Sequence, residues 1–122
     1  MRDHRKLRAF QLADDLVLLT YKSTADFPKS EQFGLTNQLR RATVSIASNI
    51  VEGSARFTEA EYIRFLDIAY GSACEVEYQI SVAIRLGFIE LPQASGWESA
   101  AHETARTLNG LLRSLRRQSP EA

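Results

Sequence analysis

The chain has 122 residues, the usual size of one domain and enough to enclose a single hydrophobic core. Its 15 basic and 15 acidic side chains balance, so the molecule as a whole has no field that attracts nucleic acid or an anionic membrane. The single cysteine, Cys74, excludes an internal disulfide framework and a cysteine-based zinc cluster. Residues 1–10 lack a signal-peptide core, and no run reaches the roughly 18 apolar residues of a membrane span. We therefore expect a cytoplasmic protein without membrane contact.

Prolines and glycines divide the chain into four long segments with helical periodicity. The expected helices cover approximately residues 5–25, 31–53, 58–86 and 92–118. Ser30 is the expected N-cap of the second helix, and Thr58 with Glu61 forms a capping box at the start of the third. Gly87 is the expected end of the third helix, and Pro92 suits the first turn of the fourth.

The connections between these helices are short, and no stretch shows the alternation of a β-strand. Short connections place consecutive helices side by side in opposite directions. The sequence therefore predicts an all-α fold, an antiparallel up-down-up-down four-helix bundle that forms one domain over residues 1–122.

The second and third helices carry more apolar surface than one bundle core can cover. The second has a core stripe and another stripe on nearly the opposite side, and the apolar arc of the third exceeds the ~100° of an ordinary surface helix. Such a surplus predicts self-association into a homo-oligomer. The expected interface residues are Val44, Ala47, Val51, Leu66 and Ile84.

A polar row follows the same two helices. It consists of Arg41, Ser45, Asn49, Glu52, Arg64 and Glu75. One interpretation is a structural network between helices or subunits, in which a glutamate accepts from an arginine while Asn49 and the serines satisfy backbone near Gly53. The other is an acid/base pair that acts on a substrate. An arginine partner keeps a carboxylate ionised, which suits proton transfer poorly, so we favour the network and expect no catalytic residue.

The spacing of possible ligands indicates whether the sequence could form a metal site. A di-iron bundle needs carboxylates on all four helices and a Glu-x-x-His motif on two of them. His4 and His102 are the only histidines, and neither follows a glutamate by three residues. Cys74 has no histidine on its own helix and is expected to be a packing residue. We expect neither a metal nor a cofactor.

Positive charge gathers in two segments, which we call the basic pole. Its members are Arg2, Arg5, Lys6, Arg8, Arg106, Arg113, Arg116 and Arg117. In an up-down-up-down bundle the first helix begins where the fourth ends, so both segments meet at one end. They form either a solvated face with cations near a helix C-terminus or a site for nucleic-acid phosphates. No aromatic residue is interleaved with them, so base stacking is not indicated.

Three stretches resemble a known family. They are YKSTADFP (Tyr21 to Pro28), FGLTNQLRRATVSIASNIVEG (Phe33 to Gly53) and FLDIAYGSACEVE (Phe65 to Glu77). The family consists of small bacterial four-helix-bundle proteins named for open reading frames in intervening sequences of 23S rRNA genes. It is similar to the accessory variability protein of diversity-generating retroelements, a ring-forming bundle that works with a reverse transcriptase and its template RNA. The resemblance implies a ring-like homo-oligomer, with a pentamer favoured, and no catalytic activity.

Three functions are open at this point. The first is a non-enzymatic assembly protein or adaptor whose basic pole contacts the backbone of RNA or DNA. The second is a scaffold that binds proteins only, for instance an accessory subunit of a reverse transcriptase or another RNA enzyme. The third, which we favour least, is a metal-dependent or hydrolytic enzyme.

Overall fold

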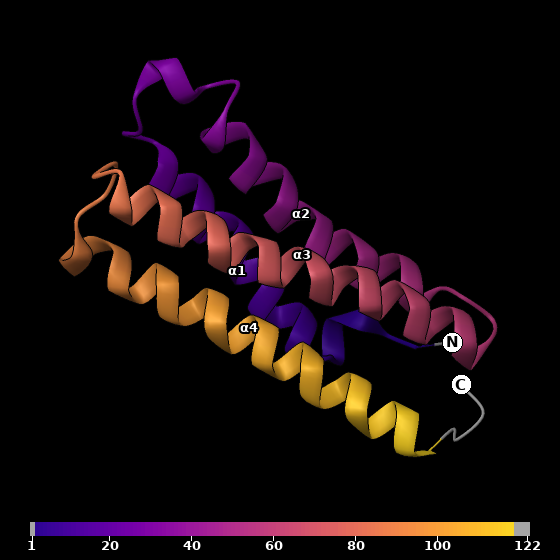
Figure 1. The fold of residues 1–122 in the computed structure, drawn as a ribbon. Coiled ribbons are helices and arrows are strands. Elements are labelled where there is room, and N and C mark those ends of the chain that lie inside the picture. Colours follow the sequence, from indigo (N-terminus) through magenta and orange to yellow (C-terminus); the bar gives the residue numbers. More distant parts are fainter. Residues whose placement is uncertain (1, 119–122) are drawn as a thin grey trace.

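The computed structural model describes residues 2–118, and these residues form four long α-helices with no β-strand among them (Figure 1). The helices are α1 (Arg8–Thr24), α2 (Leu35–Ser54), α3 (Glu59–Arg85) and α4 (Leu91–Gln118), with short 3-10 turns η1 (His4–Lys6) and η2 (Lys29–Glu31) before α1 and α2. The all-α class is confirmed. Met1 and residues 119–122, which the predicted domain includes, lie outside the described part.

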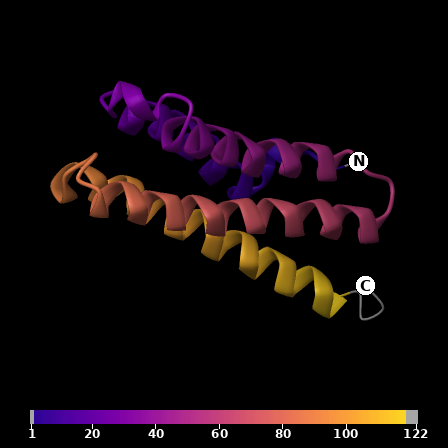
Figure 2. The ribbon, with the colours of Figure 1, turned by 45° about the horizontal axis from the view of Figure 1, so that its top comes forward.

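The helices pack in pairs around one core. Contacts join α1 to α2 and α4, and α3 to α2 and α4. Figure 2 shows α1 and α2 as one layer and α3 and α4 as the other. The start of α1 and the end of α4 lie at the same end of the bundle, next to the connection between α2 and α3 (Figure 1).

The first helix begins later than residue 5, where the sequence placed it. The Asp3 side chain accepts from the Arg5 backbone N–H at 3.1 Å and caps the turn η1. Leu7 is extended and packs against the core, so α1 begins at Arg8. A local side-chain cap thus competes with the helix over its first residues.

The second helix also begins later than expected. Ser30 lies within η2 and does not cap α2, which begins at Leu35 after Gly34. The Glu31 side chain accepts from the Leu35 backbone N–H at 3.0 Å, so Glu31 takes the role predicted for Ser30. A carboxylate at this position also faces the positive end of the helix dipole.

Both ends of the third helix are confirmed. The Thr58 hydroxyl accepts from the Glu61 backbone N–H at 3.1 Å, as the capping box predicts. Gly87 has φ +77°, and the backbone N–H of Phe88 reaches the Ala83 carbonyl at 3.0 Å. This is a Schellman ending, which needs the left-handed conformation that glycine adopts freely. Pro92 lies in the first turn of α4, as expected.

The core is built from the apolar faces of all four helices. Its fully buried side chains include Ala13 and Leu16 from α1, Leu39, Ile46 and Ile50 from α2, Leu66, Val76 and Ile80 from α3, and Trp97, Leu108 and Leu112 from α4. These apolar side chains of α4 therefore face the core. Among residues 2–118, no helix is long and apolar enough to cross a bilayer.

Helices α2 and α3 approach closely at Gly53. A Cβ atom at this position would lie 2.8 Å from the Cβ of Phe65, so no other residue fits without moving a helix. This glycine does not end α2, which continues through Ser54. Its place is fixed by packing against α3 instead.

Candidate functional site

Three ion pairs join the chain segments in the half of the bundle that contains the start of α1 and the end of α4. Arg2 pairs with Glu59 at the start of α3, with 2.7 Å between Nη2 and Oε1. Arg8 pairs with Glu103 of α4, and Arg116 of α4 pairs with Asp67 of α3. Part of the basic pole therefore holds the helices to one another.

The members of the basic pole differ in their pairing. Four have a carboxylate partner: Arg2, Arg5, Arg8 and Arg116. Within residues 2–118, Lys6, Arg106, Arg113 and Arg117 form no ion pair, and all four are exposed. Exposed ion pairs contribute little to stability, so an incoming phosphate can replace a carboxylate at small cost.

Asp3 shows how the carboxylates at this end are held. The Arg5 side chain donates to Asp3 through Nε at 3.0 Å, and the Arg5 backbone N–H donates as well. These bonds lower the pKa of the Asp3 carboxyl below its ordinary value and raise the pKa of the Arg5 guanidinium. Both groups are therefore charged at neutral pH.

The balanced charge of the chain hides an uneven distribution along the bundle. Residues 2–8, 52–67 and 103–117, which the ion pairs join, hold ten basic and six acidic side chains. The other described residues hold five basic and eight acidic side chains. The half of the bundle that holds the basic pole therefore has a net positive charge, which favours the approach of a polyanion.

Sequence reasoning missed part of this end, namely the turn between α2 and α3. Arg2 Nη1 donates to the Arg56 carbonyl at 3.2 Å, and its guanidinium lies 4.0 Å from the centre of the Tyr62 ring. The next residue, Phe57, is 94% exposed. The sequence does show Phe57 as a single aromatic residue next to an arginine in a polar loop. Its position near the basic pole, however, follows only from the fold.

Tyr62 lies beneath this turn and is almost completely buried. Burial raises the pKa of its phenol, the charge of Arg2 partly opposes that shift, and the charge of Glu59 adds to it. The phenol is neutral at physiological pH, so Tyr62 serves as a packing surface for Arg2.

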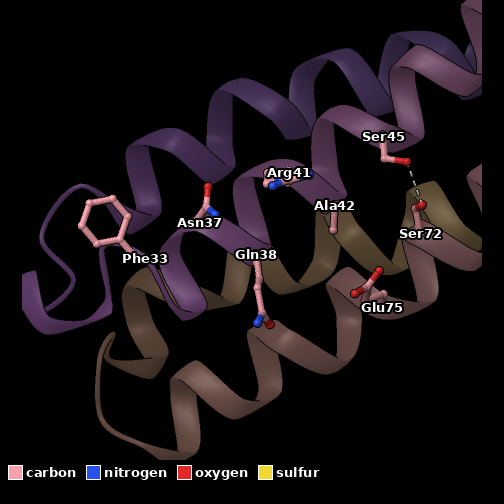
Figure 3. Close-up of a pocket in the computed structure, with 8 residues that line it drawn as sticks. All are labelled: Phe33, Asn37, Gln38, Arg41, Ala42, Ser45, Ser72 and Glu75. Carbon is pink, nitrogen blue, oxygen red and sulfur yellow. Dashed lines mark hydrogen bonds between the residues drawn. The ribbon is translucent and has the colours of Figure 1, made fainter.

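The polar row on α2 and α3 is partly formed as predicted. Ser45 and Ser72 are hydrogen-bonded across the two helices at 3.0 Å (Figure 3). Asn49 Nδ2 donates to the Ser45 carbonyl at 2.8 Å. Asn49 thus satisfies backbone one turn back, and the expected contact near Gly53 is absent from the described structure.

The ion pairs predicted for this row are wrong. Neither Glu52 nor Glu75 pairs with Arg41 or Arg64 anywhere in the described structure. Glu75 instead accepts from Gln79 one turn further along α3, at 3.2 Å. The sequence places these charges on the correct helices but cannot give the rotation of each helix against its neighbour.

An open pocket of about 490 Å³ lies beside this row, between the first half of α2 and the middle of α3. Figure 3 shows Gln38 and Ala42 on the side of α2 toward α3, opposite Ser72 and Glu75, with Phe33 at the rim. Its side chains include no nucleophile–base pair in hydrogen-bond contact. The pocket therefore gives no support to catalysis.

The expected oligomer interface is partly at the surface. Val44 is 39% exposed and Val51 is 38% exposed, whereas Ala47 and Ile84 are half-buried against the core. Leu66 is fully buried inside its own chain, so its assignment to an interface is wrong. The wide apolar arc of α3 is explained by its contacts with α2 and α4.

Possible metal ligands are dispersed. Within residues 2–118, no three side chains of histidine, cysteine, aspartate or glutamate gather at one point. His102 Nδ1 lies 3.0 Å from Glu77 Oε2 of α3. Cys74 is exposed, which contradicts its predicted packing role.

The fold defines a class, the all-α proteins with four helices. The model of the family described as 23S rRNA-intervening sequence protein matches residues 5–110. The chain belongs to this family. Among solved structures, it is similar to a protein of unknown function from the S23 ribosomal protein family of Bacteroides thetaiotaomicron. The two are 23% identical, the TM-score is 0.76, and the match covers 85% of this chain and 97% of that one. No curated protein matches.

Proposed function

We propose that this chain is a non-enzymatic cytoplasmic adaptor that assembles into a ring-like homo-oligomer and contacts the backbone of RNA or DNA through its basic pole. The bundle has up-down-up-down order, and a pentamer is the favoured assembly. The family description, which refers to an RNA sequence, is consistent with a role near RNA. No base specificity is expected, because phosphate contacts position a protein without reading sequence.

The observation that carries this proposal is the excess of basic side chains in the half of the bundle that holds the basic pole. Arg106 and Arg113 lie seven residues apart on one face of α4. Both are exposed, and neither forms an ion pair in the described structure. Lys6 adds a third such cation from the N-terminal segment. Arginine binds phosphate through two parallel N–H groups, so these side chains suit a nucleic-acid backbone. Ring symmetry would repeat the same end in every copy and multiply its attraction.

The experiment replaces three cations at the basic pole and compares them with three cations at the other end. The test variant combines Arg106→Gln, Arg113→Gln and Arg117→Gln, and the control combines Lys22→Gln, Lys29→Gln and Arg85→Gln. Binding of a fluorescent 20-nucleotide strand is followed by anisotropy at about 50 and 200 mM salt. Both variants remove the same charge, so only the position of the charge differs.

The test variant is expected to bind at least tenfold more weakly at low salt. The slope of log affinity against log salt should fall by about two, as three lost contacts to a single strand imply. The control should bind as the unmodified chain does, and sedimentation should show the same oligomer for all three. Equal losses in the two variants, or no binding by the unmodified chain, would overturn the proposal.

A protein-only scaffold is the second candidate, and one observation favours it. Half of the basic pole is already paired with carboxylates, whereas Leu18 and Tyr21 of α1 and Val44 and Val51 of α2 leave apolar surface uncovered. A discrete oligomer that ignores nucleic acid in the same assay would support this candidate, with a reverse transcriptase or another RNA enzyme as the partner. A stoichiometric amount of transition metal in the purified protein would instead support the third hypothesis, that of a metal-dependent enzyme.

A further inference from the structure

Phe57 is an uncovered aromatic ring held between two anchored residues. Before it, the Arg56 carbonyl accepts from Arg2, and the Arg56 guanidinium lies 5.6 Å from the centre of the Phe65 ring. After it, Thr58 caps α3 through its hydroxyl. The flanking backbone is therefore fixed while the Phe57 ring faces solvent, 94% exposed. Such a ring offers a flat apolar surface with little ordering left to lose on binding.

The charge around Phe57 identifies the kind of ligand that suits it. The turn lies in the half of the bundle in which basic side chains outnumber acidic ones. Its own segment holds Arg56 and Arg64 together with four carboxylates, of which Glu59 and Asp67 are paired with arginines. A scattered exposed apolar residue needs no explanation by itself. An exposed aromatic ring beside Arg2 and Arg56, however, combines the two elements of a single-strand binding surface, a stacking platform and cations that attract the backbone.

We infer that the basic pole binds single-stranded nucleic acid and that Phe57 stacks on one of its bases. The inference rests on the proposed function and adds the strandedness of the ligand. A duplex keeps the faces of its bases stacked on one another, so the Phe57 ring reaches them only at an end. Every base offers a π-face, so this contact tolerates sequence and takes RNA and DNA alike.

The structure contains its own control for Phe57. Phe33 is 87% exposed, almost as much, but it lies at the opposite end of the bundle, before α2 (Figure 3). That end lies far from the basic pole, although it holds basic side chains of its own, including Lys29 and Arg41. Phe33→Ala therefore removes an equally large exposed ring without touching the inferred surface.

The experiment measures the affinity of four proteins for three probes by anisotropy at low salt. The proteins are the unmodified chain, Phe57→Ala, Phe57→Trp and Phe33→Ala, and the probes are a 20-nucleotide RNA, the DNA strand of the same sequence and a blunt 20-base-pair DNA duplex. Phe57→Ala should weaken binding of both single strands about tenfold and leave the duplex within twofold. Phe57→Trp should retain binding, and Phe33→Ala should match the unmodified chain.

Several outcomes would overturn the inference. If the unmodified chain binds all probes and Phe57→Ala changes none of them, stacking is wrong while the proposed backbone contact stands. If Phe57→Ala weakens single strands and duplex equally, Phe57 acts without regard to strandedness. If Phe57→Ala instead lowers the sedimenting mass, a second copy covers the ring. Failure of the unmodified chain to bind any probe overturns the proposed function itself.

Discussion

The indole N–H of Trp97 on α4 donates to the hydroxyl of Thr20 on α1 at 3.0 Å, in the fully buried centre of the bundle. The hydroxyl of Thr43 on α2 lies 3.3 Å from Thr20 and 2.6 Å from the Leu39 carbonyl. One small polar cluster therefore connects three helices. Because its members are shielded from water, each must find its hydrogen-bond partner within the cluster.

Replacing Thr20 by valine should destabilise the chain. Valine has a similar shape but no hydroxyl, so the Trp97 N–H would be buried without an acceptor, at a cost of about 1–3 kcal/mol in the free energy of unfolding. Thr20→Ser is the matched control because it keeps the hydroxyl and loses only a methyl group. Urea denaturation measures both variants. Equal stability of the two would show that the hydroxyl of Thr20 is not required.

Two glycines should respond in opposite directions to replacement by alanine. Gly53→Ala places a Cβ 2.8 Å from the Cβ of Phe65, which cannot rotate away, so we expect a loss of about 1–3 kcal/mol. Gly71 lies within α3, and nothing comes within 4 Å of a Cβ there. Gly71→Ala should therefore gain about 0.5–1 kcal/mol from helix propensity alone. Urea denaturation of the pair tests the close approach of α2 and α3, and a gain for both variants would contradict it.

The sequence predicts best those features that depend on neighbours along the chain. Periodicity gives the helices, and Thr58 and Gly87 give both ends of α3, because their caps are made within a few residues. The cap by Glu31 is also local, but Ser30 offered a competing signal that only the folded turn η2 resolves.

The remaining features depend on how the helices are rotated against one another. From the sequence, Leu66 belongs to the surplus apolar surface of the third helix, but in the fold it is fully buried where α3 packs against its neighbours. Ser45 finds its partner in Ser72, 27 residues away, rather than in a charged side chain of the same row. Phe57 becomes notable only when the fold brings Arg2 to the carbonyl of Arg56. Composition and periodicity contain none of these distances, so the candidate site could be predicted only as two charged segments.

Alkaline pH should destabilise the chain in part through Tyr62. Burial raises the pKa of this phenol above its ordinary value of 10.0, so the folded chain holds the proton more tightly than the unfolded chain does. The contribution is complete below pH 10 and is lost as the pH rises through the raised pKa. The free energy of unfolding should therefore fall more steeply between pH 9 and about 11 than it does in Tyr62→Phe, which cannot ionise there. Urea titrations at the two pH values measure this difference. Parallel losses would contradict the burial of the phenol.

A glutamate on the exposed stripe of α2 should break the proposed oligomer. Val44 and Val51 are seven residues apart on one face of α2, each more than one-third exposed, and α1 leaves Leu18 and Tyr21 uncovered. If a second copy covers this surface, Val44→Glu or Val51→Glu buries an unpaired carboxylate at the contact, which strongly disfavours association. Sedimentation should then show the 13.7 kDa monomer, with unchanged helical circular dichroism because both side chains point away from their own core. Leu91→Glu, at an exposed position where α4 begins, is the control and should keep the mass of the unmodified chain. An unchanged mass for both valine variants would move the interface away from this stripe.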